Sequence, residues 1–294
     1  MHLNKQNLDA LFQAYNAAFR EGLGMAPSDW EKLAMVIPSS TSENVYPWIG
    51  KLPGIREWLG DRVIENIAAY DYRIKNRTFE LTVGVRREDV EDDQYGLYAP
   101  LFQDLGNQAA IHPNQMVFGA LRDAETELCY DGQPFFSTAH PVGEIQVSNL
   151  LAPASNPGTA WYLINNRRPV KPIIFQRRRG YELHRMDRMD DENVFMRGEY
   201  IYGIDARLNV GYGFWQLAVK STKPLNDENY AEARALMASY RNDVGTPLGL
   251  LPTILLVPPT LEADARRVVV AATLANGATN VWAGSAELVV SPWL

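Results

Sequence analysis

Residues 95–121 read YGLYAPLFQDLGNQAAIHPNQMVFGAL, and this stretch decides the fold. Its apolar residues recur at the three- and four-residue spacing of one face of an α-helix. Pro100 suits the first turn of a helix, whereas Pro113 lies inside the pattern, where it removes a backbone donor. The sequence therefore predicts one long helix that is kinked or interrupted after His112.

Three acidic residues, Glu91, Asp92 and Asp93, come directly before this stretch. Carboxylates near the start of a helix accept hydrogen bonds from its unpaired amides and offset its dipole. The alternative, a carboxylate metal site, is disfavoured because no histidine stands nearby at ligand spacing. We therefore interpret the three residues as helix caps.

The composition is that of an ordinary globular protein. The chain has 294 residues, 46% of them hydrophobic, enough to bury one large core or two modest ones. Its net charge is −7 and its pI about 5.2, so we expect no broad basic face for sequence-specific binding of nucleic acid. The single cysteine, Cys129, excludes an internal disulfide and fits a reducing compartment. We find neither a secretion signal nor an apolar run of about 18 residues, and expect no membrane partner.

The N-terminal part combines a helix with an irregular segment. Residues 3–23 have mostly helical apolar spacing, which predicts an amphipathic arm. Residues 25–62 contain four prolines and the tryptophans Trp30, Trp48 and Trp58, so little regular structure is expected there. Because an exposed indole is costly, we expect Trp48 and Trp58 to lie against the subunit's own core or against a neighbour.

Residues 68–85 change to an alternating period of two, which predicts two strands joined near Asn76. The large side chains of the apolar face are Tyr70, Tyr72, Phe79 and Leu81. A lone two-stranded hairpin is marginally stable in water, so this face needs a sheet, a helix or another chain to cover it.

The remainder reads as mixed strands and helices. In a largely β region from 161 to 219, strands are expected at 170–176, 194–204 and 214–219, with a charged interruption between them. Further along, helices are expected at 226–238 and 261–274, and strands at 253–257 and 287–290.

One basic cluster, Arg177, Arg178 and Arg179, stands out in this region, and acidic residues follow it between 187 and 192. We interpret the cluster as solvated or as an inter-subunit ionic contact, and phosphate contact is the alternative.

The sequence predicts no catalytic, cofactor-binding or metal-ligating residues. The four histidines lack paired spacing, and no dinucleotide fingerprint or phosphate loop occurs. Ser137 and His140 could form part of a hydrolase triad, but no Gly-x-Ser-x-Gly turn is present. We interpret both, with Cys129, as residues whose replacement by alanine leaves function unchanged.

Several long strings nevertheless resemble one family over nearly the whole chain: the major head (capsid) subunit of Mu-like phages and prophages. The strings are IPSSTSENVYPWIGKLPGIREWLGDR, IKNRTFELTVGVRREDVEDD, LCYDGQPFFSTAHP, DENVFMRGEYIYGIDARLNVGYGFWQLA, GTPLGLLPTILLVPPTLEADARR and ELVVSPWL.

The resemblance implies an α+β, HK97-like phage capsid fold. It implies four parts: an N-terminal arm at 1–34, an extended loop region at 35–92, a peripheral domain at 93–225 with a spine helix at 97–121, and an axial domain at 226–294. Residues 68–85 would belong to the extended loop. The inter-subunit contacts expected on this basis are Trp48, Trp58, Tyr70, Tyr72, Phe79, Leu81, Arg177, Arg178 and Arg179.

The function implied is that of a major capsid protein, not an enzyme, which self-assembles into the icosahedral head shell around double-stranded DNA. Its partners would be further copies of itself in hexamers and pentamers, scaffolding, portal and decoration proteins, and DNA bound non-specifically. It would be found in the virion after assembly in the bacterial cytoplasm. Two alternatives stay open: an encapsulin-type nanocompartment shell and a soluble α+β hydrolase.

Overall fold

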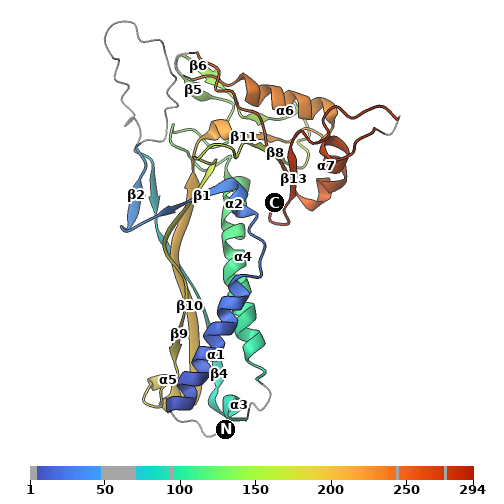
Figure 1. Ribbon diagram of the computed structural model, residues 1–294. Helices are drawn as coiled ribbons and strands as arrows, with labels where there is room; N and C mark the ends of the chain where they lie inside the picture. Colours follow the sequence, from blue (N-terminus) through green and yellow to red (C-terminus); the bar gives the residue numbers. More distant parts are fainter. Residues whose placement is uncertain (1–4, 48–70, 93–95, 243–244, 275–276) are drawn as a thin grey trace.

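The computed structural model describes residues 5–47, 71–92, 96–242, 245–274 and 277–294. The chain forms a long body with a head at one end (Figure 1). We call "body" the four-stranded sheet with helices α1 and α4, and "head" the five-stranded sheet with helices α6 and α7.

The long helix of the body is α4, Ala99–Asp123, and it begins with Pro100 in its first turn as predicted. The expected interruption after His112 is wrong, because the helix continues through Pro113. Tertiary contacts hold the chain at this point: the side chain of the buried Asn114 accepts a hydrogen bond from the Trp30 amide at 3.2 Å and donates one to the Pro27 carbonyl at 2.9 Å.

The predicted N-terminal helix is present as α1, Lys5–Leu23, and it packs along α4 of its own chain (Figure 1). Two glycines allow the backbones to meet. A Cβ atom at Gly106 of α4 would overlap the carbonyl oxygen of Phe19, and one at Gly22 of α1 would overlap that of Gln103. The ring of Tyr15 in α1 also stabilises the contact by stacking on the ring of Phe102 in α4, with the ring centroids 4.1 Å apart.

Two of the acidic residues before α4, Glu91 and Asp92, do not cap it. Glu91 and Asp92 lie in a separate short helix, α3, Arg87–Asp92, where Glu91 pairs with Arg87 at 2.8 Å, and Asp93 lies outside the described residues. The residue that precedes α4 is Tyr98, whose side chain makes no capping hydrogen bond. A further short helix, α2, spans Trp30–Leu33.

The body sheet has the strand order β1-β9-β10-β4. Its strands are β1 Ala34–Pro38, β9 Ile173–Met186, β10 Glu199–Tyr212 and β4 Arg77–Arg86. Strand β1 runs parallel to β9, and the other neighbours are antiparallel. Opposite residues in an antiparallel pair share one face, so Ile204 and Leu81, which face each other across β10 and β4, lie on the same side of the sheet.

The hairpin predicted within 68–85 is wrong for the residues described. β3, Arg73–Lys75, pairs with β2, Glu43–Val45, whereas β4 pairs with β10. The side chain of Asn76, which joins β3 to β4, is buried. It donates to the Ser39 hydroxyl and the Thr41 carbonyl, both at 2.8 Å, and accepts from Gln176 at 2.8 Å. This polar network directs the two strands into different sheets.

The region from 161 to 219 is mostly β as predicted, but its parts differ. The three arginines at 177–179 lie within β9 and do not interrupt it. Residues 194–197, expected in a strand, belong to helix α5, Glu192–Arg197, in which Asn193 and Val194 are buried and which Gly198 ends in the left-handed conformation.

The head sheet has the order β13-β12-β8-β11-β7. Its strands are β13 Glu287–Val290, β12 Ile254–Val257, β8 Trp161–Ile164, β11 Ala218–Ser221 and β7 Leu150–Leu151. Three of them precede residue 226, where we expected the axial domain to begin, so the sheet extends across that boundary.

The head helices are α6, Asp227–Ser239, and α7, Glu262–Val269. Asn226 caps α6 by accepting from the Asn229 amide, which is the helix start that the sequence predicted. Helix α7 is shorter than predicted and follows a 3-10 turn, η2, Pro259–Leu261. Beside the head lie the short pair β5 His140–Val142 and β6 Ile145–Val147 and the 3-10 turn η1, Trp215–Leu217. None of the described helices has the length and apolar character needed to cross a bilayer.

Candidate functional site

The aromatic residues expected at subunit contacts have different surroundings. Trp48, Trp58 and Tyr70 lie outside the described residues. Tyr72 is directed into its own subunit, where its hydroxyl accepts a hydrogen bond from the Tyr212 amide at 2.8 Å. Burial raises the pKa of Tyr72 to about 12. A contact of Tyr72 with a neighbouring subunit stays a prediction.

Phe79 and Leu81 lie on β4, the edge strand of the body sheet, and line an open cavity of about 250 Å³ between this strand and α4. Leu81 is 40% exposed. A second hollow of about 530 Å³ shares Phe79 and Gln115 with the first, so the two make one groove along α4. We call it the β4 groove.

A histidine forms part of the wall of the β4 groove. The Nδ1 atom of His112 lies 2.6 Å from the Tyr181 hydroxyl, and the imidazole packs against the ring of Phe79 at 4.6 Å. Burial lowers the pKa of His112, so its ring is neutral at neutral pH and serves as a hydrogen-bonding wall of the groove.

The basic cluster lies exposed along β9. Arg179 pairs with Asp205 of β10, which also pairs with His184 at 2.9 Å. The acidic residues that follow the cluster in sequence do not all face solvent: Asp187 is buried and its carboxylate lies 3.5 Å from Arg185. The inter-subunit role of Arg177, Arg178 and Arg179 stays a prediction.

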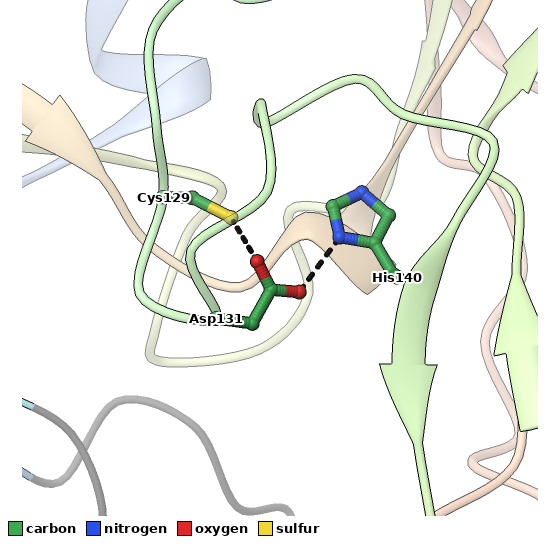
Figure 2. Close-up of side chains that lie close together, drawn as sticks. All are labelled: Cys129, Asp131 and His140. Atoms are coloured by element: carbon green, nitrogen blue, oxygen red, sulfur yellow. Dashed lines mark hydrogen bonds and ion pairs between the residues drawn. The ribbon is translucent and has the colours of Figure 1, made fainter. Parts of the chain in front are cut away.

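Cys129, Asp131 and His140 form a polar cluster whose possible metal-ligand atoms all lie within 4.8 Å of one another (Figure 2). The Cys129 thiol lies 3.1 Å from one carboxylate oxygen of Asp131, and Nδ1 of His140 lies 2.7 Å from the other. The side chains of Asp131 and His140 are 1% and 0% exposed. The cluster is therefore sealed from solvent.

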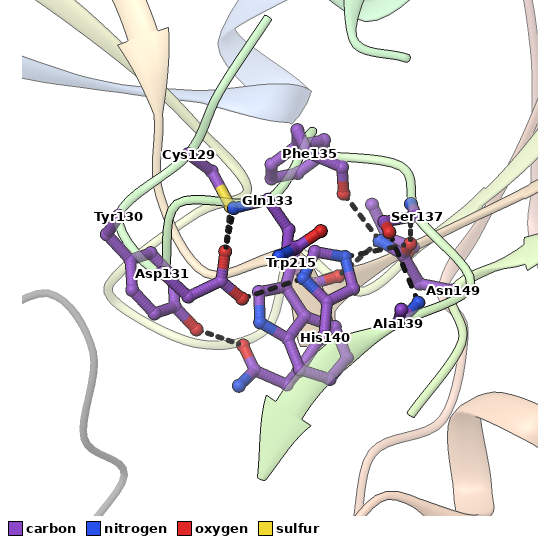
Figure 3. Close-up of polar contacts among 12 residues, drawn as sticks. Cys129, Tyr130, Asp131, Gln133, Phe135, Ser137, Ala139, His140, Asn149 and Trp215 are labelled. Carbon is purple, nitrogen blue, oxygen red and sulfur yellow. Dashed lines mark hydrogen bonds and ion pairs between the residues drawn. The ribbon is translucent and has the colours of Figure 1, made fainter. Parts of the chain in front are cut away.

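The surroundings fix the imidazole in place (Figure 3). The His140 ring lies flat on Trp215, with ring centroids 4.1 Å apart, and its Nε2 is 3.2 Å from the Asn149 side-chain oxygen. The Asn149 amide group donates to the carbonyls of Phe135, Trp215 and Ala218, which sets its orientation. Both ring nitrogens of His140 thus lie within hydrogen-bond distance of a side-chain oxygen.

The electrostatics favour a hydrogen-bonded pair over a reactive centre. Burial opposes ionisation of Asp131, but hydrogen bonds from His140, Cys129 and the Gln133 amide outweigh it and lower the pKa of this carboxyl. Burial, together with the charge of Asp131, raises the pKa of the Cys129 thiol far above its usual range. The thiol is therefore a neutral donor and not a nucleophile.

The same geometry fits neither a triad nor a closed metal site. The Ser137 hydroxyl accepts from the Ala139 amide at 3.2 Å, while the ring nitrogens of His140 face Asp131 and Asn149. A structural zinc site takes four ligands, whereas three ligand atoms converge here and each already has a hydrogen-bond partner. We interpret the cluster as structural: it holds residues 129–149 against Trp215 through His140 and Asn149. Sequence spacing did not reveal it, because Cys129 and Asp131 resemble ordinary turn residues.

A substitution at Asn149 tests the structural role of this cluster. We expect Asn149→Asp to lower the free energy of unfolding by about 3 kcal/mol, because a carboxylate oxygen would then face carbonyl oxygens that now receive hydrogen bonds. Chemical denaturation checks this. Asn226→Asp, at the exposed N-cap of α6, is the control and should change stability by less than about 0.5 kcal/mol, because an aspartate accepts the same hydrogen bond from the Asn229 amide. Equal effects of the two substitutions would contradict the role of Asn149.

The body, with a long helix against a long sheet, and the separate head define a class: the chain has the α+β, HK97-like fold of phage capsid subunits. It belongs to the Mu-like prophage major head subunit gpT family, whose model matches residues 8–294. The predicted family and fold are confirmed.

Named relatives match most or all of the chain. The chain is 41% identical to the major capsid protein of Escherichia phage Mu over 305 aligned positions, covering 100% of both proteins. It is 39% identical to the Mu-like prophage FluMu major head subunit of Haemophilus influenzae, covering 88% of this chain and 87% of that one. In structure it is similar to the procapsid of bacteriophage JBD30, with a TM-score of 0.89, 44% identity and coverage of 99% and 100%. The JBD30 capsid follows with a TM-score of 0.82, 32% identity and coverage of 100% and 99%. The nanocompartment and hydrolase alternatives are not favoured.

Proposed function

We propose that copies of this chain join by heterologous contacts into hexamers and pentamers and close into the icosahedral head shell around the double-stranded DNA of a tailed, Mu-like phage. The observation that carries this is the full-length similarity to the JBD30 procapsid subunit, with a TM-score of 0.89. In this proposal the body is the peripheral domain and the head is the axial domain.

The place of assembly and the partners of the subunit follow from the same proposed function. The shell is assembled in the cytoplasm of the bacterial host with scaffolding and portal proteins. Decoration is supported by a solved JBD30 capsid that is described as decorated with minor capsid protein trimers. DNA is held without sequence preference, in keeping with a net charge of −7. The subunit performs no catalysis and needs no cofactor.

The β4 groove is the best candidate for a contact between neighbours in this shell. Among the described residues, β4 pairs only with β10, so its other edge has backbone donors and acceptors without a strand partner. Native proteins rarely leave a long edge strand bare, and β4 has ten residues. Phe79 and Leu81 line the hollow beside that edge, which offers an adjoining segment both main-chain and apolar contacts.

A substitution at Leu81 tests the proposed contact. We expect Leu81→Asp to abolish closed shells while lowering the free energy of unfolding by only about 1 kcal/mol, because the side chain is 40% exposed in the subunit. Negative-stain microscopy and sedimentation of the purified protein measure shells, and denaturation measures stability. Thr78→Asp, on the other face of the same strand, is the matched control.

The wild-type protein tests the function itself. Closed shells are expected from the purified chain, alone or with its scaffolding protein, and DNA is expected in shells taken from lysates of the host. Discrete small particles under all conditions would contradict the proposed function. Normal shells from the Leu81→Asp variant would contradict only the role of the β4 groove.

A further inference from the structure

Strands β2 and β3 form a separate two-stranded sheet beside the body (Figure 1). The chain runs outward from the body in β2 and returns in β3, and of these two strands only β3 has a buried side chain, that of Ile74. We call residues 43–46 and 72–76, which contain both strands, the stem. A two-stranded sheet is marginally stable on its own, so the position of the stem depends on how the body holds it.

Gln176 of β9 binds both sides of the stem. Its side chain is fully buried, and its Oε1 accepts a hydrogen bond from the Tyr46 hydroxyl at 2.7 Å, on the outgoing side. Its Nε2 donates to the Ile74 carbonyl at 3.0 Å and to the Asn76 side-chain oxygen at 2.8 Å, both on the returning side. One amide group of the body sheet therefore couples the two directions of the chain.

Packing against β10 seats the returning side. A Cβ atom at Gly211 would lie 2.3 Å from Cδ1 of Ile74, so the glycine leaves the space that Ile74 occupies. The Tyr212 amide donates to the Tyr72 hydroxyl at 2.8 Å. These contacts reach the returning side of the stem, and Gln176 joins the outgoing side to them.

Two ion pairs of the stem act within it and not between it and the body. Arg73 pairs with Glu43 at 3.2 Å and with Asp71 at 2.6 Å, and all three residues lie in the stem or next to it. Because the Arg73 side chain is 51% exposed, these pairs contribute little. The links to the body through Gln176 use uncharged groups, so near neutral pH they do not depend on pH or salt.

We propose that Gln176 is a positioning residue, which fixes the direction in which β2 and β3 leave the body and, through it, the geometry with which the shell closes. The proposal rests on the proposed shell function, in which the stem belongs to the extended loop region. A segment that is held in one orientation before contact loses less conformational entropy when the contact forms. Because the same subunit is repeated throughout a shell, an error in this direction is repeated too.

Spin labels measure the direction of the stem in the unassembled subunit. Val45→Cys in β2 and Glu182→Cys in β9 provide two exposed positions, and the native Cys129 is buried. Pulsed electron paramagnetic resonance is expected to give one narrow distance between the labels. Adding Gln176→Met, which keeps the length of the side chain but removes its three hydrogen bonds, should broaden or shift that distance. Circular dichroism establishes that the subunit is folded.

Two tyrosine variants make the same chemical change in different places. Tyr46→Phe removes the hydroxyl that binds Gln176, whereas Tyr240→Phe removes a hydroxyl in the head that donates to the Ser148 carbonyl at 2.9 Å. Tyr240→Phe should leave the label distance, the yield of shells and their diameter unchanged, while Tyr46→Phe should broaden the distance and lower the yield.

Assembly gives the second measurement. We expect Gln176→Met to lower the yield of closed shells at least about tenfold, with open or misshapen particles in their place, and Tyr46→Phe to lower it less. Negative-stain microscopy and sedimentation measure the shells, and chemical denaturation compares the stability of the variants. If Gln176→Met does not fold, Tyr46→Phe keeps two of the three hydrogen bonds and serves for both measurements.

The outcomes separate this proposal from the proposed function. If the wild-type protein forms no shells, the shell function fails, and the label distances still report on Gln176. An unchanged, narrow distance in folded Gln176→Met overturns the positioning role, and so do shells of normal yield and diameter from that variant. Equal losses of shells in Tyr46→Phe and Tyr240→Phe would also overturn it, because stability and not direction would then control assembly.

Discussion

Replacement of Gly106 by alanine is expected to lower the free energy of unfolding by about 3 kcal/mol and to separate α1 from α4. A Cβ atom at this position would overlap the backbone carbonyl oxygen of Phe19. Backbone cannot rotate away as a side chain can, so α1 must shift as a unit. The shift disrupts the stacking of Tyr15 on Phe102 and its edge contact with Tyr202.

The same helix supplies a matched control. Gly119 also lies within α4, but a Cβ atom there would find only the end of the Arg122 side chain, at 4.0 Å. Alanine favours a helix over glycine by about 1 kcal/mol, so Gly119→Ala should stabilise the protein slightly. The two variants make the same chemical change in one helix and are expected to have effects of opposite sign.

Thermal melting and hydrogen exchange measure the outcome. Amides of α1 should lose protection in Gly106→Ala, while those of the head sheet keep it, because the disturbed contact lies only in the body. A Gly106→Ala protein that melts at or above the wild-type temperature would show that α1 does not depend on this close approach.

How far the sequence predicts the fold depends on how local the signal is. The apolar spacing of residues 99–123 and the cap at Asn226 are local, and both helices begin close to where they were expected. The effect of Pro113 was misjudged, because the contacts of Asn114 with Trp30 and Pro27 come from residues more than 80 positions away.

Strand partners were harder to predict than strands. The alternation at 73–86 correctly indicated extended chain, but alternation carries no information on which strand lies alongside. Hydrogen bonds of Asn76 and Gln176 across 100 positions decide that β3 and β4 separate. The sequence likewise did not predict that the head strands form one sheet, because β8 and β12 are paired although about 90 residues of sequence separate them.

The cluster of Cys129, Asp131 and His140 also could not be predicted from local sequence, because its contacts form only in the folded chain. In the sequence, His140 stands in a turn-rich stretch, and its replacement was expected to be neutral. The structure buries its side chain completely between Asp131, Asn149 and Trp215. The neutral replacement stays a prediction for shell function, whereas this burial leads us to expect a loss of stability when a residue of the cluster is replaced.

We accordingly expect Asp131→Asn to lower the free energy of unfolding by about 3–5 kcal/mol at neutral pH. This substitution keeps the shape of the side chain but removes a buried carboxylate that receives hydrogen bonds from Cys129, the Gln133 amide and His140, and buried polar groups that lose such a partner are costly. The control is Asp205→Asn. Asp205 also pairs with a histidine, His184, but at the surface, where the histidine side chain is 58% exposed. The expected cost there is at most about 1 kcal/mol.

The pH dependence gives an independent measurement. The pKa of Asp131 is lowered in the folded protein from its ordinary 3.8, so its contribution to stability is present above pH 3.8 and is lost as the pH falls through the lowered pKa. Denaturation curves of wild type and Asp131→Asn should therefore differ most at neutral pH and converge in strong acid. If the two curves stay a constant distance apart down to the lowest pH at which the protein folds, the loss comes from packing and not from the buried charge.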